Sequence, residues 1–146
     1  MDTSFDLLHV FDAMHPGLVT CSPDASLRTV ARMMATYRVH AVLVSAHGGE
    51  RLPGGSPWGV VSDADLLRAT DGADLDKQPA STIATTPLVT VSSSDGLGLA
   101  TRLMVEHDVS HLLVLDPASG RPIGVLSTLD VARALAGFPE RHPVGA

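Results

Sequence analysis

Apolar residues recur at helical spacing in two long stretches of the chain, residues 27–37 and 97–107. Such a period predicts helices that each present one apolar face. The apolar positions of the first stretch are Leu27, Val30, Met33 and Met34. Asp24 precedes this stretch and is the predicted N-cap, because a short acidic side chain can accept hydrogen bonds from the first helical amides.

Other stretches have the pattern of strands. The run "VHAVLV" at residues 39–44 predicts a buried strand, and "WGVVS" at 58–62 predicts its partner, followed by a short helix in "DADLLRA". The Gly- and Pro-rich stretch "AHGGERLPGGSPW" between the two strands predicts a hairpin connection. With a short extended run at Leu18–Thr20, the expected order is strand, helix, strand, strand, helix.

The same order returns in the second half of the chain. "LVTCSPDASL" from Leu18 aligns with "LVTVSSSDGL" from Leu88, and "GVVSDAD" from Gly59 aligns with "GVLSTLD" from Gly124. Self-similarity over this length indicates an internal duplication. We therefore expect a first repeat at residues 1–70, a polar linker at 71–80, a second repeat at 81–137 and a tail without pattern at 138–146.

Length and composition narrow the possibilities. A chain of 146 residues with 45% hydrophobic residues is expected to form a single compact unit around one core. The formal net charge of −6, with Lys77 as the only lysine, argues against nucleic acid or an anionic membrane as a partner. The single cysteine, Cys21, cannot form an internal disulfide, and no signal peptide or membrane span is predicted. A cytoplasmic protein is expected.

The most specific local pattern is a serine followed three residues later by an aspartate, at the predicted junction of strand and helix. It occurs as Ser62 with Asp65 and as Ser127 with Asp130. Two interpretations fit the pattern: a capping box that satisfies the helix start, or a ligand site in which the carboxylate accepts hydrogen bonds from ribose hydroxyls. The two are compatible, because a carboxylate has several acceptor positions.

The duplicated order, the segment "VFDAMHPGLVTCSPDASL" before a helix, and "GVVSDAD" or "GVLSTLD" after a hairpin together resemble a tandem pair of CBS domains. The resemblance covers about residues 8–136. It implies a mixed α+β fold with two repeats packed about a pseudo-twofold axis, and two clefts that bind adenosyl ligands. It also implies a regulatory module acting on a separate protein rather than an enzyme.

By this resemblance, each cleft combines the serine and aspartate of one repeat with the leading segment and a strand of the other. One cleft would contain Val125, Ser127 and Asp130 together with Asp12, His15, Gly17, Leu18, Val39, His40 and Ala41. The other would contain Val60, Ser62 and Asp65 together with Thr82, Thr85, Pro87, Leu88, Val109, Ser110 and His111.

The residue before the aspartate, often basic in this family, is Ala64 or Leu129 here. Asp63 adds a negative charge beside Ser62, so the Asp65 cleft is expected to be the poorer phosphate site. The Asp130 cleft, with His15 and His40 as donors, is favoured for AMP or ADP. S-adenosylmethionine is the ligand expected to tolerate acidic surroundings.

Other chemistry is not supported. His107 and His111 are four residues apart, but the helix is expected to end near Asp108, so a metal site is not predicted. Cys21 is expected to fill space beside the sheet, and no set of nucleophile, base and orienting group is found. We expect no required cofactor and a homodimer formed through the amphipathic helices. The alternative is a ligand-free dimerisation scaffold, in which the serines and aspartates only cap helices.

Overall fold

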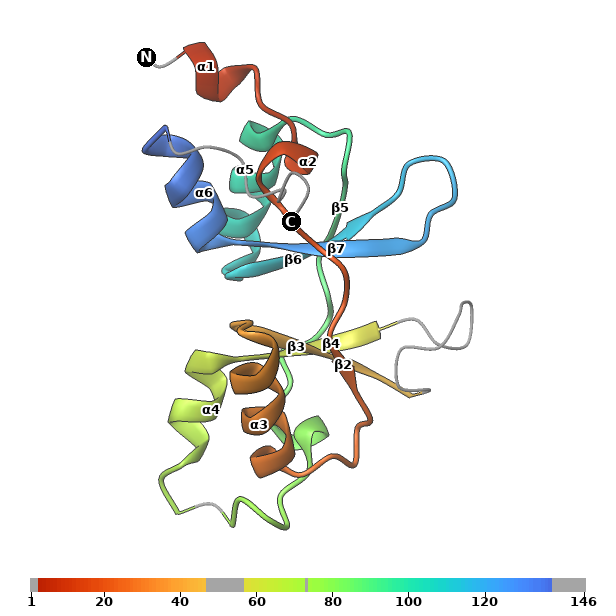
Figure 1. Ribbon diagram of the computed structural model, residues 1–146, viewed down its shortest axis with the longest axis vertical. Coiled ribbons are helices and arrows are strands. Elements are labelled where there is room, and N and C mark those ends of the chain that lie inside the picture. Colours follow the sequence, from red (N-terminus) through yellow and green to blue (C-terminus); the bar gives the residue numbers. More distant parts are fainter. Residues whose placement is uncertain (1–2, 47–56, 73, 138–146) are drawn as a thin grey trace. The chain divides into compact units, whose positions relative to one another are not determined.

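The structure of the protein is a computed structural model that describes residues 3–46, 57–72 and 74–137 (Figure 1). The chain forms two compact units, one made of Met1–Gly17 with Val89–Ala146 and the other of Leu18–Leu88. We call them unit 1 and unit 2. Each has its own cluster of buried apolar side chains. The expectation of a single core is therefore wrong, because each repeat covers its small sheet with its own helices.

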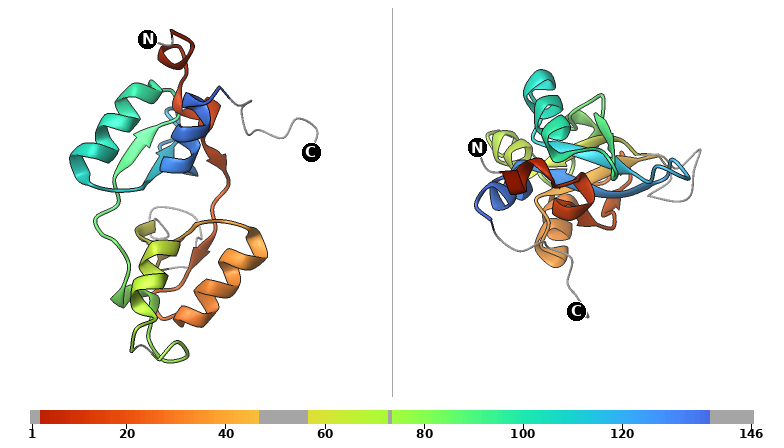
Figure 2. Two further views of the ribbon diagram at one scale, coloured as in Figure 1. Left: turned by 90° about the vertical axis from the view of Figure 1, so that its left-hand side faces the viewer. Right: turned by 90° about the horizontal axis from the view of Figure 1, so that it is seen from above.

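Unit 2 has the element order predicted for the first repeat. Its elements are β2 (Thr20–Cys21), α3 (Leu27–Tyr37), β3 (Ala41–Ser45), β4 (Pro57–Ser62), α4 (Asp63–Ala69) and the 3-10 turn η1 (Ala80–Thr82). The sheet order is β2-β3-β4, with β2 and β3 parallel and β3 and β4 antiparallel. Helix α3 packs on β3 and against α4 (Figure 2). Most of the predicted hairpin connection, residues 47–56, lies outside the described residues.

The N-cap of helix α3 lies two residues after the predicted one. Ser26 is the N-cap, and its Oγ accepts a hydrogen bond from the Thr29 amide at 3.1 Å. Asp24 instead belongs to the preceding turn, where its own amide donates to Ser22 Oγ at 3.1 Å. The prediction of Asp24 as N-cap is wrong, although Leu27, Val30 and Met34 form the buried face of α3 as expected.

Unit 1 contains the second repeat and the start of the chain. Its elements are α1 (Thr3–Asp6), α2 (Val10–Ala13), β1 (His15–Pro16), β5 (Thr90–Ser92), α5 (Leu97–His107), β6 (His111–Leu115), β7 (Pro122–Ser127) and α6 (Thr128–Leu135). The sheet order is β1-β7-β6-β5. Helices α5 and α6 pack against each other and on β6 and β7 (Figure 2). The apolar pattern did not predict α1, α2 or β1.

The segment that leads into each repeat pairs with the hairpin of the other repeat. In unit 1, β1 runs antiparallel to β7, with His15 opposite Val125. In unit 2, Thr85, in the leading segment of the second repeat, forms an isolated bridge with Val60 on β4. The compact units thus divide the chain differently from the sequence repeats. This exchange brings each leading segment to the end of a strand that carries the serine and aspartate motif.

The predicted linker contacts the start of α3. The Leu27 amide donates to Gln78 O at 3.0 Å, and the Arg28 amide donates to Leu75 O at 3.0 Å. The Arg28 guanidinium also pairs with the Asp76 carboxylate at 2.5 Å. These contacts satisfy amides that a helix start leaves without intrahelical partners. Within the described residues, no helix is long and apolar enough to cross a membrane.

Candidate functional site

The motif of the second repeat forms a capping box at the start of α6. The Ser127 Oγ accepts a hydrogen bond from the Asp130 amide at 3.2 Å, and the Ser127 amide donates to Asp130 Oδ2 at 2.8 Å. The Ser127 hydroxyl also donates to Asp130 Oδ2 at 3.0 Å. Asp130 is only 2% exposed. One carboxylate oxygen is therefore committed to the helix start, as the capping interpretation predicts.

The other oxygen of Asp130 faces the leading segment. His15 lies on β1 opposite Val125, and its Nδ1 is 3.3 Å from Asp130 Oδ1. Burial acts to raise the pKa of Asp130, but the hydrogen bonds from His15 and Ser127 and the charge of His15 outweigh it, so that this pKa is lowered. The side chain of His15 is 42% exposed, whereas that of Asp130 is 1% exposed. Asp130 is thus a buried carboxylate with a half-exposed imidazole beside it.

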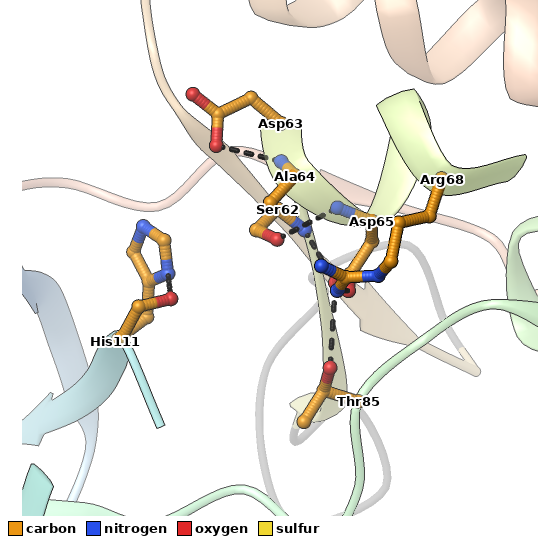
Figure 3. Close-up of polar contacts among 8 residues, drawn as sticks. Ser62, Asp63, Ala64, Asp65, Arg68, Thr85 and His111 are labelled. Carbon is orange, nitrogen blue, oxygen red and sulfur yellow. Dashed lines mark hydrogen bonds and ion pairs between the residues drawn. The ribbon is translucent and has the colours of Figure 1, made fainter. Parts of the chain in front are cut away.

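The motif of the first repeat forms the same box at the start of α4 (Figure 3). The Ser62 amide donates to Asp65 Oδ2 at 2.9 Å, and the Asp65 amide donates to Ser62 Oγ at 3.1 Å. Thr85 Oγ1 donates to the same Oδ2 at 3.3 Å, while Arg68 Nη2 donates to Oδ1 at 2.6 Å. The guanidinium of Arg68, which is always charged, therefore binds one oxygen of the buried Asp65 carboxylate. The other oxygen accepts hydrogen bonds from the Ser62 amide and from the Thr85 hydroxyl.

The first turn of α4 carries a further negative charge that α6 lacks. Asp63 Oδ1 accepts a hydrogen bond from the Ala64 amide at 2.8 Å (Figure 3), and its Oδ2 is 3.2 Å from Nδ1 of His40. The corresponding position of α6 is the uncharged Thr128. A carboxylate that already occupies a helix-start amide disfavours a phosphate group there. The start of α4 therefore carries more negative charge than the start of α6.

The predicted site residues divide between the units. Unit 1 contains Asp12, His15, Gly17, Val109, Ser110, His111, Val125, Ser127 and Asp130. Unit 2 contains Leu18, Val39, His40, Ala41, Val60, Ser62, Asp65, Thr82, Thr85, Pro87 and Leu88. Within the units, the structure brings His15 to Asp130 and Thr85 to Asp65, in each case joining a leading segment to the motif of the other repeat.

The predicted strand residues border the motif of their own repeat. Ala41 lies opposite Ser62 in the sheet of unit 2, and His111 lies opposite Ser127 in the sheet of unit 1. Ser110 Oγ is 3.0 Å from Nδ1 of His111. The carboxylate of Asp12 caps α2, because its Oδ2 accepts a hydrogen bond from the His9 amide at 2.8 Å.

One partner of the motif was missed from sequence. Arg68 lies three residues after Asp65 and binds its carboxylate. The signal was present, because Arg133 follows Asp130 at the same spacing and the two arginines align between the repeats. Arginine is suited to this position, since its guanidinium stays charged over the physiological range and presents several donors.

Metal and thiol chemistry find no support among the described residues. They contain no group of three or more His, Cys, Asp or Glu side chains that could hold a metal ion. Helix α5 ends at His107 and His111 begins β6, so these histidines do not share a helix face. Cys21 is buried, and its burial raises the pKa of the thiol to about 11. A thiol with such a pKa is a poor nucleophile at neutral pH.

Comparison with known proteins gives one consistent family. The family profile described as "CBS domain" matches residues 10–72 and 80–137. The CBS domain-containing protein YhcV of Bacillus subtilis (strain 168) is 27% identical over 124 residues, which is 84% of this chain and 82% of that protein.

Solved structures show the same fold. A CBS domain protein from Pyrobaculum aerophilum complexed with AMP has a TM-score of 0.70 and 30% identity, and the match covers 89% of this chain and 99% of that chain. The CBS domain pair of protein MJ0100, complexed with 5′-methylthioadenosine and S-adenosyl-L-methionine, has a TM-score of 0.73 at 17% identity, with 89% and 97% covered.

Proposed function

The chain belongs to the CBS domain family as a pair of such domains, and from this premise we propose that it is a regulatory module that binds an adenosyl ligand and modulates a separate protein. The ligand class is supported by the relative from Pyrobaculum aerophilum, which is complexed with AMP. The proposal includes no catalytic step and no required cofactor. It places the module in the cytoplasm, where adenine nucleotides are abundant.

The proposal rests on one observation: a buried aspartate, Asp65 or Asp130, lies at the strand-to-helix junction of each repeat. Capping a helix requires only one oxygen of Asp130, and Oδ2 supplies it through the Ser127 contacts. Oδ1 lies beside the half-exposed His15 and is the oxygen a ribose hydroxyl would use. Hydrogen bonds from hydroxyl groups to a carboxylate are about twice as strong as neutral ones, which suits a small polar ligand.

The proposed ligand of the Asp130 motif is AMP or ADP. The start of α6 carries Thr128 and Leu129 rather than acids, so a phosphate meets less repulsion there than beside Asp63. Gly17, which follows β1 in the same unit, belongs to this proposed site. The Asp65 motif, with Val60, Thr85 and Pro87 of the same unit, is proposed for an adenosyl ligand without phosphate, such as S-adenosylmethionine.

A ligand-free dimerisation scaffold is the second candidate. The complete capping boxes of Ser62 with Asp65 and of Ser127 with Asp130 favour it, because each aspartate already has a structural role. A homodimer is part of both proposals. Helix α5 supports it with an apolar outer side chain, Val105, that is 80% exposed.

Isothermal titration with AMP distinguishes a ligand site from a cap at Asp130. Loss of charged hydrogen bonds worth about 1.5 to 3 kcal/mol predicts that Asp130→Ala weakens AMP binding by about 10- to 150-fold. The matched variant Asp65→Ala is expected to have a smaller effect on AMP. As a cap alone, Asp130→Ala would cost about 1 kcal/mol of stability and leave the affinity intact.

Two further results complete this test. Asp130→Asn keeps the size of the side chain and one acceptor oxygen, so it shows whether lost affinity follows the charge rather than the fold. AMP affinity that is equal in wild type and Asp130→Ala, with both folded, would assign the motif to helix capping. No heat change or melting shift with AMP, 5′-methylthioadenosine or S-adenosylmethionine would support the scaffold instead.

A further inference from the structure

The two repeats place different side chains at one equivalent position of their leading segments. His15 and Thr85 correspond in the alignment that matches Leu18 with Leu88. Both make the same backbone contact, His15 opposite Val125 on β7 and Thr85 opposite Val60 on β4. Both also reach the motif aspartate. The repeats therefore provide an internal comparison of an imidazole and a hydroxyl beside the same buried carboxylate.

The two side chains bind different oxygens of that carboxylate. Thr85 donates to Oδ2 of Asp65, the oxygen that also accepts from the Ser62 amide, while Oδ1 accepts from Arg68. His15 instead lies 3.3 Å from Oδ1 of Asp130, and Oδ2 accepts the two hydrogen bonds from Ser127. His15 thus covers the Asp130 oxygen that is not needed by the capping box.

We propose that His15 controls ligand binding at Asp130 by competing with ribose hydroxyls for Oδ1, so that protonated His15 weakens the binding of an adenosyl ligand. This inference rests on the proposed function, because it concerns the same site. His15 has room to turn aside, since its side chain is 42% exposed, whereas the side chain of Asp130 is 1% exposed. A ligand would displace the imidazole, not the carboxylate.

The direction of the pH dependence follows from charge. Histidine is the side chain whose ordinary titration falls between pH 5 and 8. An imidazolium binds a carboxylate more strongly than a neutral imidazole does, so it is the harder of the two to displace. Asp130 stays ionised over this interval because its pKa is lowered from an already acidic value. Ligand affinity should therefore rise as the pH is raised.

Other charged or titratable groups lie on the elements around β1 and α6. They are His9 and Asp12 at α2, Arg133 on α6, His111 on β6, and Arg102, Glu106 and His107 on α5. Strand β7 contributes none. A change confined to His15 leaves all these groups in place, and any pH dependence that they cause will persist in the variant.

The test measures binding of 5′-methylthioadenosine by isothermal titration at pH 5.5 and pH 7.5, with Asp65→Ala present in every protein compared so that the Asp130 motif is the one measured. This probe has no group that titrates in the interval, whereas the phosphate of AMP does. Wild type is expected to bind about fivefold more tightly at pH 7.5, the difference expected between displacing a charged and a neutral hydrogen bond. His15→Thr copies the side chain at Thr85 and is expected to bind equally at both pH values.

His15→Asn serves as a second variant, because its amide can donate to Asp130 but does not titrate. The affinity of His15→Asn should also be independent of pH. If His15→Thr does not fold, His15→Asn provides the comparison with wild type. Equal wild-type affinity at both pH values, tighter binding at pH 5.5, or an undiminished fivefold difference in folded variants would overturn the inference while leaving the proposed function intact. Absence of binding of any adenosyl probe to wild type at either pH would instead overturn the proposed function.

Discussion

Replacing Gly124 by alanine tests how closely the leading segment of the first repeat passes over β7. Pro16 lies opposite Gly124 in the antiparallel pair of β1 and β7. A Cβ at Gly124 would overlap the carbonyl oxygen of His15 and would lie 2.5 Å from Met14 Cε. The carbonyl belongs to a paired strand and cannot easily move, whereas the end of the Met14 side chain is flexible although Met14 is only 1% exposed. We expect Gly124→Ala to cost about 2 to 3 kcal/mol of stability, as overpacking of a buried contact does.

The matched variant Gly59→Ala changes the equivalent position of the first repeat. A Cβ there would lie 3.1 Å from Thr86 Cγ2, 3.2 Å from Ala84 Cβ and 3.4 Å from Thr85 O. Shifts of a few tenths of an ångström relieve such contacts, and alanine also restricts the unfolded chain, which offsets part of the cost. The expected loss for Gly59→Ala is below about 1 kcal/mol.

Thermal unfolding followed by circular dichroism compares the two variants. At about 2 to 4 °C per kcal/mol for a chain of this size, Gly124→Ala should lower the melting temperature by about 5 to 10 °C and Gly59→Ala by less than about 4 °C. Equal losses in the two variants, or a larger loss for Gly59→Ala, would refute the packing argument.

Two further predictions concern assembly and acid stability. Light scattering should give the mass of a homodimer, and Val105→Glu, which places a charge on the exposed face of α5, should give a monomer; a wild-type monomer at high micromolar concentration would count against the dimer. Because folding lowers the pKa of Asp130, this carboxylate stabilises the fold above its ordinary pKa, and that stability is lost as the pH falls through the lowered value. Asp130→Asn should therefore lose less stability than wild type between about pH 4 and pH 2 in urea titrations, and identical acid profiles would contradict the assigned contacts.

The apolar pattern predicted the elements of the repeats better than their boundaries. The order of strand, helix, strand, strand, helix is confirmed in both repeats, because each element has a strong period or an apolar run. The start of α3 was predicted wrongly because Asp24 and Ser26 are both good capping residues. Which of them caps the helix is decided by the turn that holds Asp24 against Ser22. The expectation of one core was wrong because it was based on chain length. Length does not show that each of the two small sheets packs against its own helices and forms its own core.

The motif could be identified from sequence, but its partners could not. Serine and aspartate three residues apart predict a capping box from local geometry alone, and both boxes are present. The neighbour of the second carboxylate oxygen of Asp130 is His15, which lies 115 positions earlier in the chain and is brought there by the pairing of β1 with β7. His15 was expected to donate to a phosphate, and the structure instead places it against the aspartate.

The exchange of leading segments makes the two motifs chemically different although their capping boxes are alike. Arg68 gives Asp65 a partner that remains charged at any physiological pH, and Thr85 adds a neutral donor. Asp130 instead has the imidazole of His15 at 3.3 Å from its Oδ1. Since position 15 belongs to one repeat and Asp130 to the other, a substitution in the leading segment can tune one motif without altering its capping box. A duplicated domain can in this way respond differently at two sites that began as copies.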